Sequence, residues 1–77
     1  MRSAIIRGYH SENRKLEKRY IVIDNETAMN VLDLLAEKYD VLEVRNTELG
    51  LVKEFESDLL DRKSFRADLI DFLGFEW

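Results

Sequence analysis

Two segments rich in β-branched and aromatic residues, SAIIRGYH and LEKRYIVID, flank the polar stretch SENRK near the start of the chain. This pattern predicts a β-hairpin over residues 4–23, and a hairpin restricts the fold to one with an antiparallel sheet. Residues 20–23 are apolar on both sides of the second strand, which favours a position inside the sheet. Gly8, in the middle of the first strand, indicates a β-bulge or the close approach of another group.

The register of this hairpin depends on its turn. If Asn13 and Arg14 form a two-residue turn, Ile6 lies opposite Ile21. Alternation then assigns the apolar side chains to two faces. One face carries Ala4, Ile6, Ile21 and Ile23, and the other carries Ile5, Tyr9, Leu16, Tyr20 and Val22.

Residues 24–40 change to a helical pattern. Apolar side chains recur at intervals of three and four residues, namely Ala28, Val31, Leu32, Leu35 and Tyr39. Asp24 or Asn25 can cap the start of a helix, and Glu26 in the first turn suits the helix dipole. The sequence therefore predicts a helix over about residues 26–39.

The next segments predict a second hairpin and a broken helix. Strands are expected near residues 41–46 and 50–55, with one strand followed by an early helix as the alternative. Residues 57–73 have a helical composition, but their apolar side chains do not align on one face. A break near the DRKS stretch removes this conflict, with Ser64 as the cap of the second piece.

The end of the chain is strongly apolar. Gly74 stands where a glycine usually ends a helix, and this geometry would fold Phe75 back onto Ile70. We therefore expect a terminal helix docked on the core. Trp77 then either packs on the core or is available to a partner.

Together these elements predict an α+β fold in a single compact domain over residues 1–77. Two hairpins supply three or four strands of a small antiparallel sheet. The helix at about 26–39 and the broken helical segment at about 57–73 pack against this sheet. A domain of this size buries a small core, so we also expect a homodimer.

The chain contains no cysteine, which excludes disulfides and thiolate chemistry and favours a cytoplasmic location. No apolar run approaches the roughly 20 residues of a membrane-spanning helix. The N-terminal stretch also lacks the long apolar region of a signal peptide. We therefore expect no association with a membrane.

Groups that carry catalysis are scarce. His10 is the only histidine, and the three glycines lie too far apart for a phosphate-binding loop. None of the serines lies in a G-x-S-x-G motif. We therefore expect a protein that is not an enzyme, with no catalytic, cofactor-binding or metal-binding residue and no small-molecule substrate.

Charge is distributed unevenly along the chain. Residues 1–20 carry six basic and two acidic side chains, whereas residues 21–77 carry six basic and fourteen acidic ones. The basic hairpin suggests an alternative function, the binding of single-stranded nucleic acid or RNA, because cations follow phosphates and aromatic rings stack on bases. The candidate residues for this function are Arg7, Tyr9, Arg14, Lys15, Lys18 and Arg19.

The acidic C-terminal half favours a different function. Aromatic side chains within a charged rim are typical of protein interfaces. The candidate contact residues are Asp61, Phe65, Asp68, Phe72 and Trp77. The preferred hypothesis is a non-enzymatic protein-binding module that inhibits or modulates a larger protein, a role taken by many small viral proteins. A self-assembling structural subunit is the third hypothesis.

Overall fold

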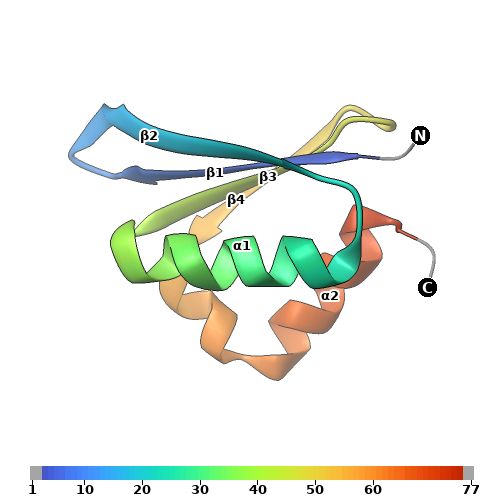
Figure 1. Ribbon diagram of the computed structural model, residues 1–77. Coiled ribbons are helices and arrows are strands. Elements are labelled where there is room, and N and C mark those ends of the chain that lie inside the picture. The colour runs from blue at the N-terminus through green and yellow to red at the C-terminus, as the bar shows by residue number, and fades with distance from the viewer. Residues whose placement is uncertain (1–2, 76–77) are drawn as a thin grey trace.

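The computed structural model describes residues 3–75, and for residues 14–17 it describes the backbone alone. Its elements are β1 (Ala4–His10), β2 (Asn13–Val22), α1 (Asn25–Lys38), β3 (Val41–Asn46), β4 (Leu51–Glu56), the 3₁₀-helix η1 (Ser57–Asp61) and α2 (Lys63–Leu73). Four antiparallel strands form one open sheet in the order β2-β1-β3-β4. Both α-helices lie on one face of the sheet, and no described element covers the other face (Figure 1). The predicted α+β fold is confirmed.

The first hairpin forms, but its predicted register is wrong by one residue. Ile21 lies opposite Ile5 instead of Ile6, and the turn consists of residues 11–12 instead of 13–14. An irregularity in the pairing at the end of β1 accommodates the difference. Because side chains alternate between the two faces, a shift of one residue exchanges the faces of β2.

This exchange determines which side chains of the first hairpin are buried. Val22 turns toward the helices and is 1% exposed, whereas Ile21 turns to the open face and is 71% exposed. β2 forms an edge of the sheet, so its predicted place inside the sheet is wrong. β1 takes an inner place, and its side chains Ala4 and Ile6 are fully buried.

Gly8 lies where the sheet closely approaches the last turn of α1 and Tyr39, which follows it. A Cβ atom at this position would lie 2.7 Å from Cδ2 of Tyr39 and 3.3 Å from Cβ of Leu35. Real Cβ atoms do not tolerate the shorter of these distances. The predicted close approach to Gly8 is therefore confirmed, and it explains a glycine inside a β-strand.

Helix α1 has the predicted start and the predicted apolar face. The backbone N–H of Thr27 donates to the carboxylate of Asp24 at 2.7 Å, and this bond holds the pKa of Asp24 below its ordinary value. Ala28, Leu32 and Leu35 point into the core and are at most 1% exposed. Within residues 3–75, no helix is both long and apolar enough to cross a membrane.

The second hairpin and the broken helix are confirmed with small differences in bounds. β3 and β4 pair in register from Val41 opposite Glu56 to Asn46 opposite Leu51. The break falls at Arg62, whose extended backbone separates η1 from α2. The predicted cap at Ser64 is wrong, because α2 starts two residues earlier than this cap requires and Arg62 stands at its cap position without a side-chain hydrogen bond.

Gly74 ends α2 as predicted. Its φ of 69° lies in the left-handed region that favours glycine, and its N–H donates to the carbonyl of Ile70 at 3.3 Å. The chain then turns back, and Phe75 joins the hydrophobic core with 7% of its surface exposed. The predicted docking of the terminal helix is confirmed, while the direct contact between Phe75 and Ile70 stays a prediction.

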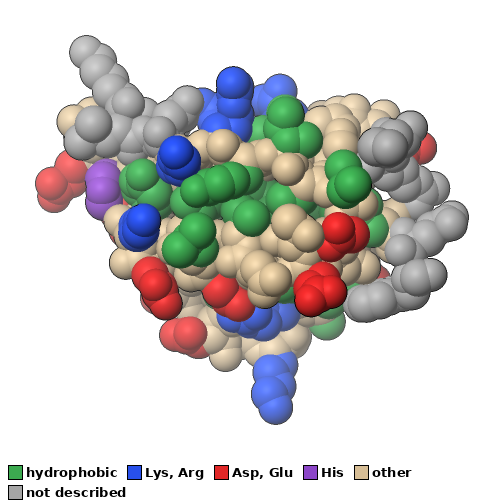
Figure 2. All heavy atoms as spheres, viewed as in Figure 1, with side chains coloured by type: hydrophobic (Ala, Val, Ile, Leu, Met, Phe, Trp, Pro, Cys, Tyr) green, Lys and Arg blue, Asp and Glu red, His purple; other side chains and the backbone are tan. Residues whose placement is uncertain are grey.

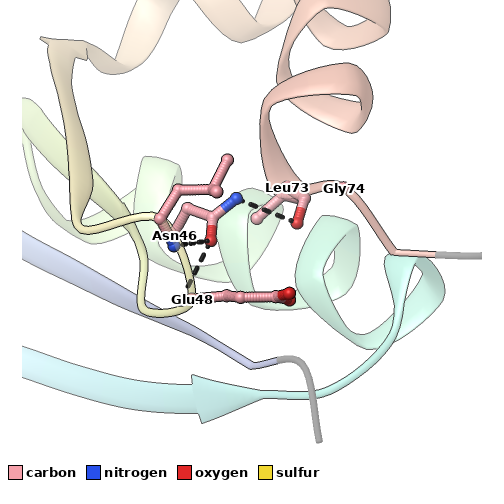
Figure 3. Close-up of a pocket in the computed structure, with 5 residues that line it drawn as sticks. Asn46, Glu48, Leu73 and Gly74 are labelled. Atoms are coloured by element: carbon pink, nitrogen blue, oxygen red, sulfur yellow. Dashed lines mark hydrogen bonds between the residues drawn. The ribbon is translucent and has the colours of Figure 1, made fainter.

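Asn46 fixes the end of α2 to the turn between β3 and β4 (Figure 3). Its side-chain amide donates to the carbonyl of Phe72 at 2.9 Å, and its side-chain oxygen accepts from the backbone N–H groups of Glu48 and Leu49, both at 3.1 Å. Asn46 is 4% exposed. A single buried side chain therefore satisfies backbone groups of a helix end and of a turn.

Arg66, near the start of α2, connects this helix to η1 and to α1. Its Nε donates to the carbonyl of Leu60 in η1 at 2.6 Å, and its guanidinium forms an ion pair with Asp33 of α1. These bonds hold α2, η1 and α1 together beneath the sheet. The helical layer is thus fixed at both ends of α2.

Candidate protein-binding surface

The predicted contact aromatics lie on the side of α2 that faces β4. The ring centroid of Phe65 is 4.8 Å from that of the buried Phe55. The Nζ atom of Lys53 lies 5.3 Å from the ring centre of Phe65 and 5.9 Å from that of Phe72. Both Phe65 and Phe72 are half-buried. The two rings therefore pack on the core with one side and present the other side to solvent beneath the ammonium group of Lys53.

One of the predicted acidic side chains borders these rings. Asp68 is exposed and lies three residues after Phe65, on the same side of α2. Asp61 is exposed at the end of η1, but it lines a hollow together with Asp33 of α1 and Arg66. Three of the predicted contact residues, Phe65, Asp68 and Phe72, are thus brought together, whereas Asp61 lies apart from them on the side that faces α1. Trp77 lies outside the described residues.

Two exposed leucines extend this surface, and neither is among the predicted contact residues. Leu51 of β4 points to the same side of the strand as Lys53, because side chains two residues apart share a face. Leu51 is 52% exposed, and Leu49 in the adjacent turn is 67% exposed. The alternation of Leu51, Lys53 and Phe55 is the sequence signal that could have revealed this extension.

We call Leu51, Lys53, Phe65, Asp68 and Phe72 the β4–α2 flank. β4 is an edge strand, so one side of its backbone is not covered by a neighbouring strand of the sheet. The flank therefore combines an open strand edge, half-buried aromatic rings and an acidic border. Such a surface can accept an extended segment beside β4 and place a side chain on the rings.

Among the described side chains, those predicted to bind nucleic acid do not form one surface. Arg7 and Arg19 pair across the strands and face the open side of the sheet, whereas Lys18 pairs with Gly8 and faces the helix side. Arg7 forms an ion pair with Glu43 at 3.6 Å, and Tyr9 is 4% exposed. Tyr9 is therefore not accessible for stacking on a base. The side chains of Arg14 and Lys15 lie outside the described part of the structure.

A polar cluster joins the turn of the first hairpin to the loop after α1. The hydroxyl of Ser11 donates to Asp40 at 2.5 Å and its N–H donates at 2.9 Å, and these bonds hold the pKa of the Asp40 carboxyl below its ordinary value. Nδ1 of His10 lies 3.7 Å from the same carboxylate. Ser11 bonds to the carboxylate instead of to a histidine that could take its proton, so the cluster lacks the order of a serine–histidine–aspartate triad.

Hydrophobic side chains also gather between β2 and α1, on the side of the molecule shown in Figure 2. Leu34 of α1 is 42% exposed, and Ile23, just after β2, is 57% exposed. On this side Tyr20 of β2 is half-buried, with Nζ of Lys18 5.8 Å from its ring centre, so the surface offers one ring beneath a lysine where Lys53 covers two. Among the side chains that the structure describes, no three of the metal-binding types are grouped closely enough to hold an ion.

Comparisons with protein-family models, with curated proteins and with solved structures find no match for this chain. The functional argument therefore starts from the chemistry of the described surfaces. Of these surfaces, the β4–α2 flank brings together the largest share of the contact residues predicted from the sequence.

Proposed function

We propose that this protein is a non-enzymatic protein-binding module that inhibits or modulates a larger protein through the β4–α2 flank. One observation carries the proposal. Phe65 and Phe72 share one side of α2 beneath Lys53, next to the exposed carboxylate of Asp68. Aromatic side chains that are partly shielded from water are among the residues that contribute most to the binding energy at protein interfaces.

The flank indicates the chemistry of its partner. An incoming arginine could replace the ammonium of Lys53 above the two rings and pair with Asp68 at the same time. The exposed side chain of Leu51 would contact an apolar residue of the same segment. We therefore expect a partner segment that combines a basic residue with an apolar one and that lies beside β4 in an extended conformation.

Two further expectations belong to this proposal. The absence of cysteine favours a protein that works in the reducing environment of the cytoplasm. The small core favours a homodimer in addition to the protein partner. A regulator without catalytic chemistry is consistent with the scarcity of nucleophiles and general bases in the sequence.

Charge reversal on the flank tests the proposal. Asp68→Lys should reduce recovery of the natural partner by roughly tenfold when tagged protein is purified from the cells that express it, because it places a cation beside the site of a basic residue. Glu37→Lys, on the exposed side of α1, is the matched control and should leave recovery unchanged. Quantitative mass spectrometry of the co-purified proteins gives the readout.

Equal recovery with Asp68→Lys and with wild type would contradict the use of the flank. Both variants change exposed side chains, so circular dichroism should give the same melting temperature for both. A partner lost from both variants would point to the net charge of the protein and not to the flank.

Binding of single-stranded nucleic acid is the second candidate function. The observation that favours it is the exposed basic edge of β2, where Nζ of Lys18 lies 5.8 Å from the ring centre of Tyr20 and Arg19 is exposed. Wild type should then shift single-stranded RNA in a gel at low salt, and Arg14→Glu combined with Lys18→Glu should abolish the shift. A wild-type protein that shifts no RNA or DNA at low salt would eliminate this function.

Self-assembly into a larger structure remains the third candidate.

A further inference from the structure

One row of side chains across the open face of the sheet is divided into a basic and an acidic half. Arg19, Arg7, Glu43 and Glu54 lie side by side across the four strands, because each is paired with the next in the register. The β2–β1 half of this row is basic, and the β3–β4 half is acidic. Within the row, Arg7 and Glu43 form the ion pair at the junction of the two halves.

The neighbouring row on the same face ends in apolar side chains on both sides. It consists of Ile21, Ile5, Arg45 and Val52. Ile21 on β2 is 71% exposed, and Val52 on β4 is 48% exposed. Two apolar side chains at opposite edges of one face cannot cover each other within one protomer.

Two such faces can stack around a two-fold axis in only two simple ways. An axis across the strands stacks β2 on β2, so that basic half meets basic half and acidic half meets acidic half. An axis parallel to the strands stacks β2 on β4 of the second copy, so that Arg19 lies over Glu54 and Ile21 lies over Val52. The charge pattern favours the second arrangement and opposes the first.

We propose that the protein forms a homodimer in which the open faces of two sheets pack together around a two-fold axis parallel to the strands. Each interface residue is then used twice, as closed symmetry requires. Aligned sheets pack about 10 Å apart with strand directions that differ by about 30°. The helices of both protomers would lie on the outside of the resulting sandwich.

This inference rests on the homodimer of the proposed function. The open sheet face adds which surfaces meet, the direction of the two-fold axis and the residues that lie opposite each other. The dimer would leave the β4–α2 flank accessible. Val52 and Glu54 point to the open side of β4, whereas Leu51 and Lys53 point to the helix side. Variants of Arg19 or Glu54 therefore test the dimer, and variants of Asp68 test partner binding, so the two proposals can fail separately.

A charge-swap series tests the dimer by sedimentation and light scattering over a range of protein concentrations. Wild type should show twice the monomer mass of 9.2 kDa and should dissociate as salt concentration rises. Arg19→Glu and Glu54→Arg should each raise the dissociation constant roughly tenfold, because each turns two symmetric attractive contacts into repulsive ones. Arg19→Glu combined with Glu54→Arg should restore dimerisation, since the pair is reversed.

Lys63→Glu, an exposed charge reversal at the start of α2, should leave dimerisation unchanged and serves as the control. A wild type that stays monomeric at the highest concentration would overturn the proposal. A dimer that tolerates both single reversals, or one that the combined variant fails to restore, would show that Arg19 and Glu54 do not face each other.

Discussion

Replacing Phe75 by alanine should lower the free energy of unfolding by about 3–5 kcal/mol. Phe75 is 7% exposed in the hydrophobic core, although it lies after the last helix. The left-handed backbone of Gly74 turns the chain so that this ring returns to the helical layer. Truncation would remove the whole buried ring and leave a cavity beside α2. Urea unfolding monitored by circular dichroism measures the loss.

Leu49→Ala is the control for Phe75→Ala. Leu49 is 67% exposed in the turn between β3 and β4, so its truncation should change stability by less than about 0.5 kcal/mol. A loss below about 1 kcal/mol for Phe75→Ala would mean that the ring contributes little to the core, and the docking of the chain after α2 would then be wrong.

Replacing Gly8 by valine should prevent stable folding. A Cβ atom at Gly8 would lie 2.7 Å from Cδ2 and 3.1 Å from Cγ of Tyr39, and a branched side chain adds two methyl groups to this clash. Overpacking of this kind costs typically 1–3 kcal/mol for small additions and more for larger ones. Gly8→Ala should therefore fold with reduced stability, and Gly8→Val should unfold at room temperature or lose its cooperative transition.

The penalty of Gly8→Ala should disappear when Tyr39 is also shortened. In a Tyr39→Ala background the clash with the ring is absent and only the milder contact of 3.3 Å with Cβ of Leu35 remains. Alanine should then be neutral or favourable by up to about 1 kcal/mol, because glycine in a strand loses more backbone entropy on folding. Thermal unfolding of wild type, the two single variants and the double variant gives the coupling free energy between positions 8 and 39. An unchanged penalty in the Tyr39→Ala background would show that the ring is not what requires glycine at position 8.

The helices and the second hairpin could be predicted from the sequence because local signals determine them. The spacing of Ala28, Leu32 and Leu35 defines one face of α1, and Asp24 caps its start. The change of apolar direction after Leu60 requires the break that falls at Arg62. Each of these features depends on residues a few positions apart.

The register and place of the first hairpin could not be predicted, because both depend on partners distant in the sequence. The turn at residues 11–12 has no Asn-Gly or Asp-Gly pair to fix it. Ile21 makes β2 apolar on both sides, which is typical of an inner strand, yet Ile21 is 71% exposed at an edge. The pairing of β1 with β3 excludes β2 from the inner position, and no local pattern encodes that pairing.

The candidate site could be predicted only in part, because some of its residues meet only through tertiary packing. Phe65, Asp68 and Phe72 lie on one helix, so their spacing brings them together. Leu51 and Lys53 join them only through the contact between β4 and α2, which tertiary packing creates. The nucleic-acid candidates belong to two strands, and their faces depended on the register that the sequence left open.

Site-specific photocrosslinking tests the central claim, that the β4–α2 flank contacts another protein. A photoreactive amino acid at position 68 or at position 67 places the probe on neighbouring exposed residues that point in directions about 100° apart around α2. The account predicts one discrete adduct with a heterologous protein from position 68, absent from position 67 and lost when Lys53 and Phe72 are replaced by glutamate. Adducts of equal yield from both positions, or adducts from position 67 alone, would contradict the account.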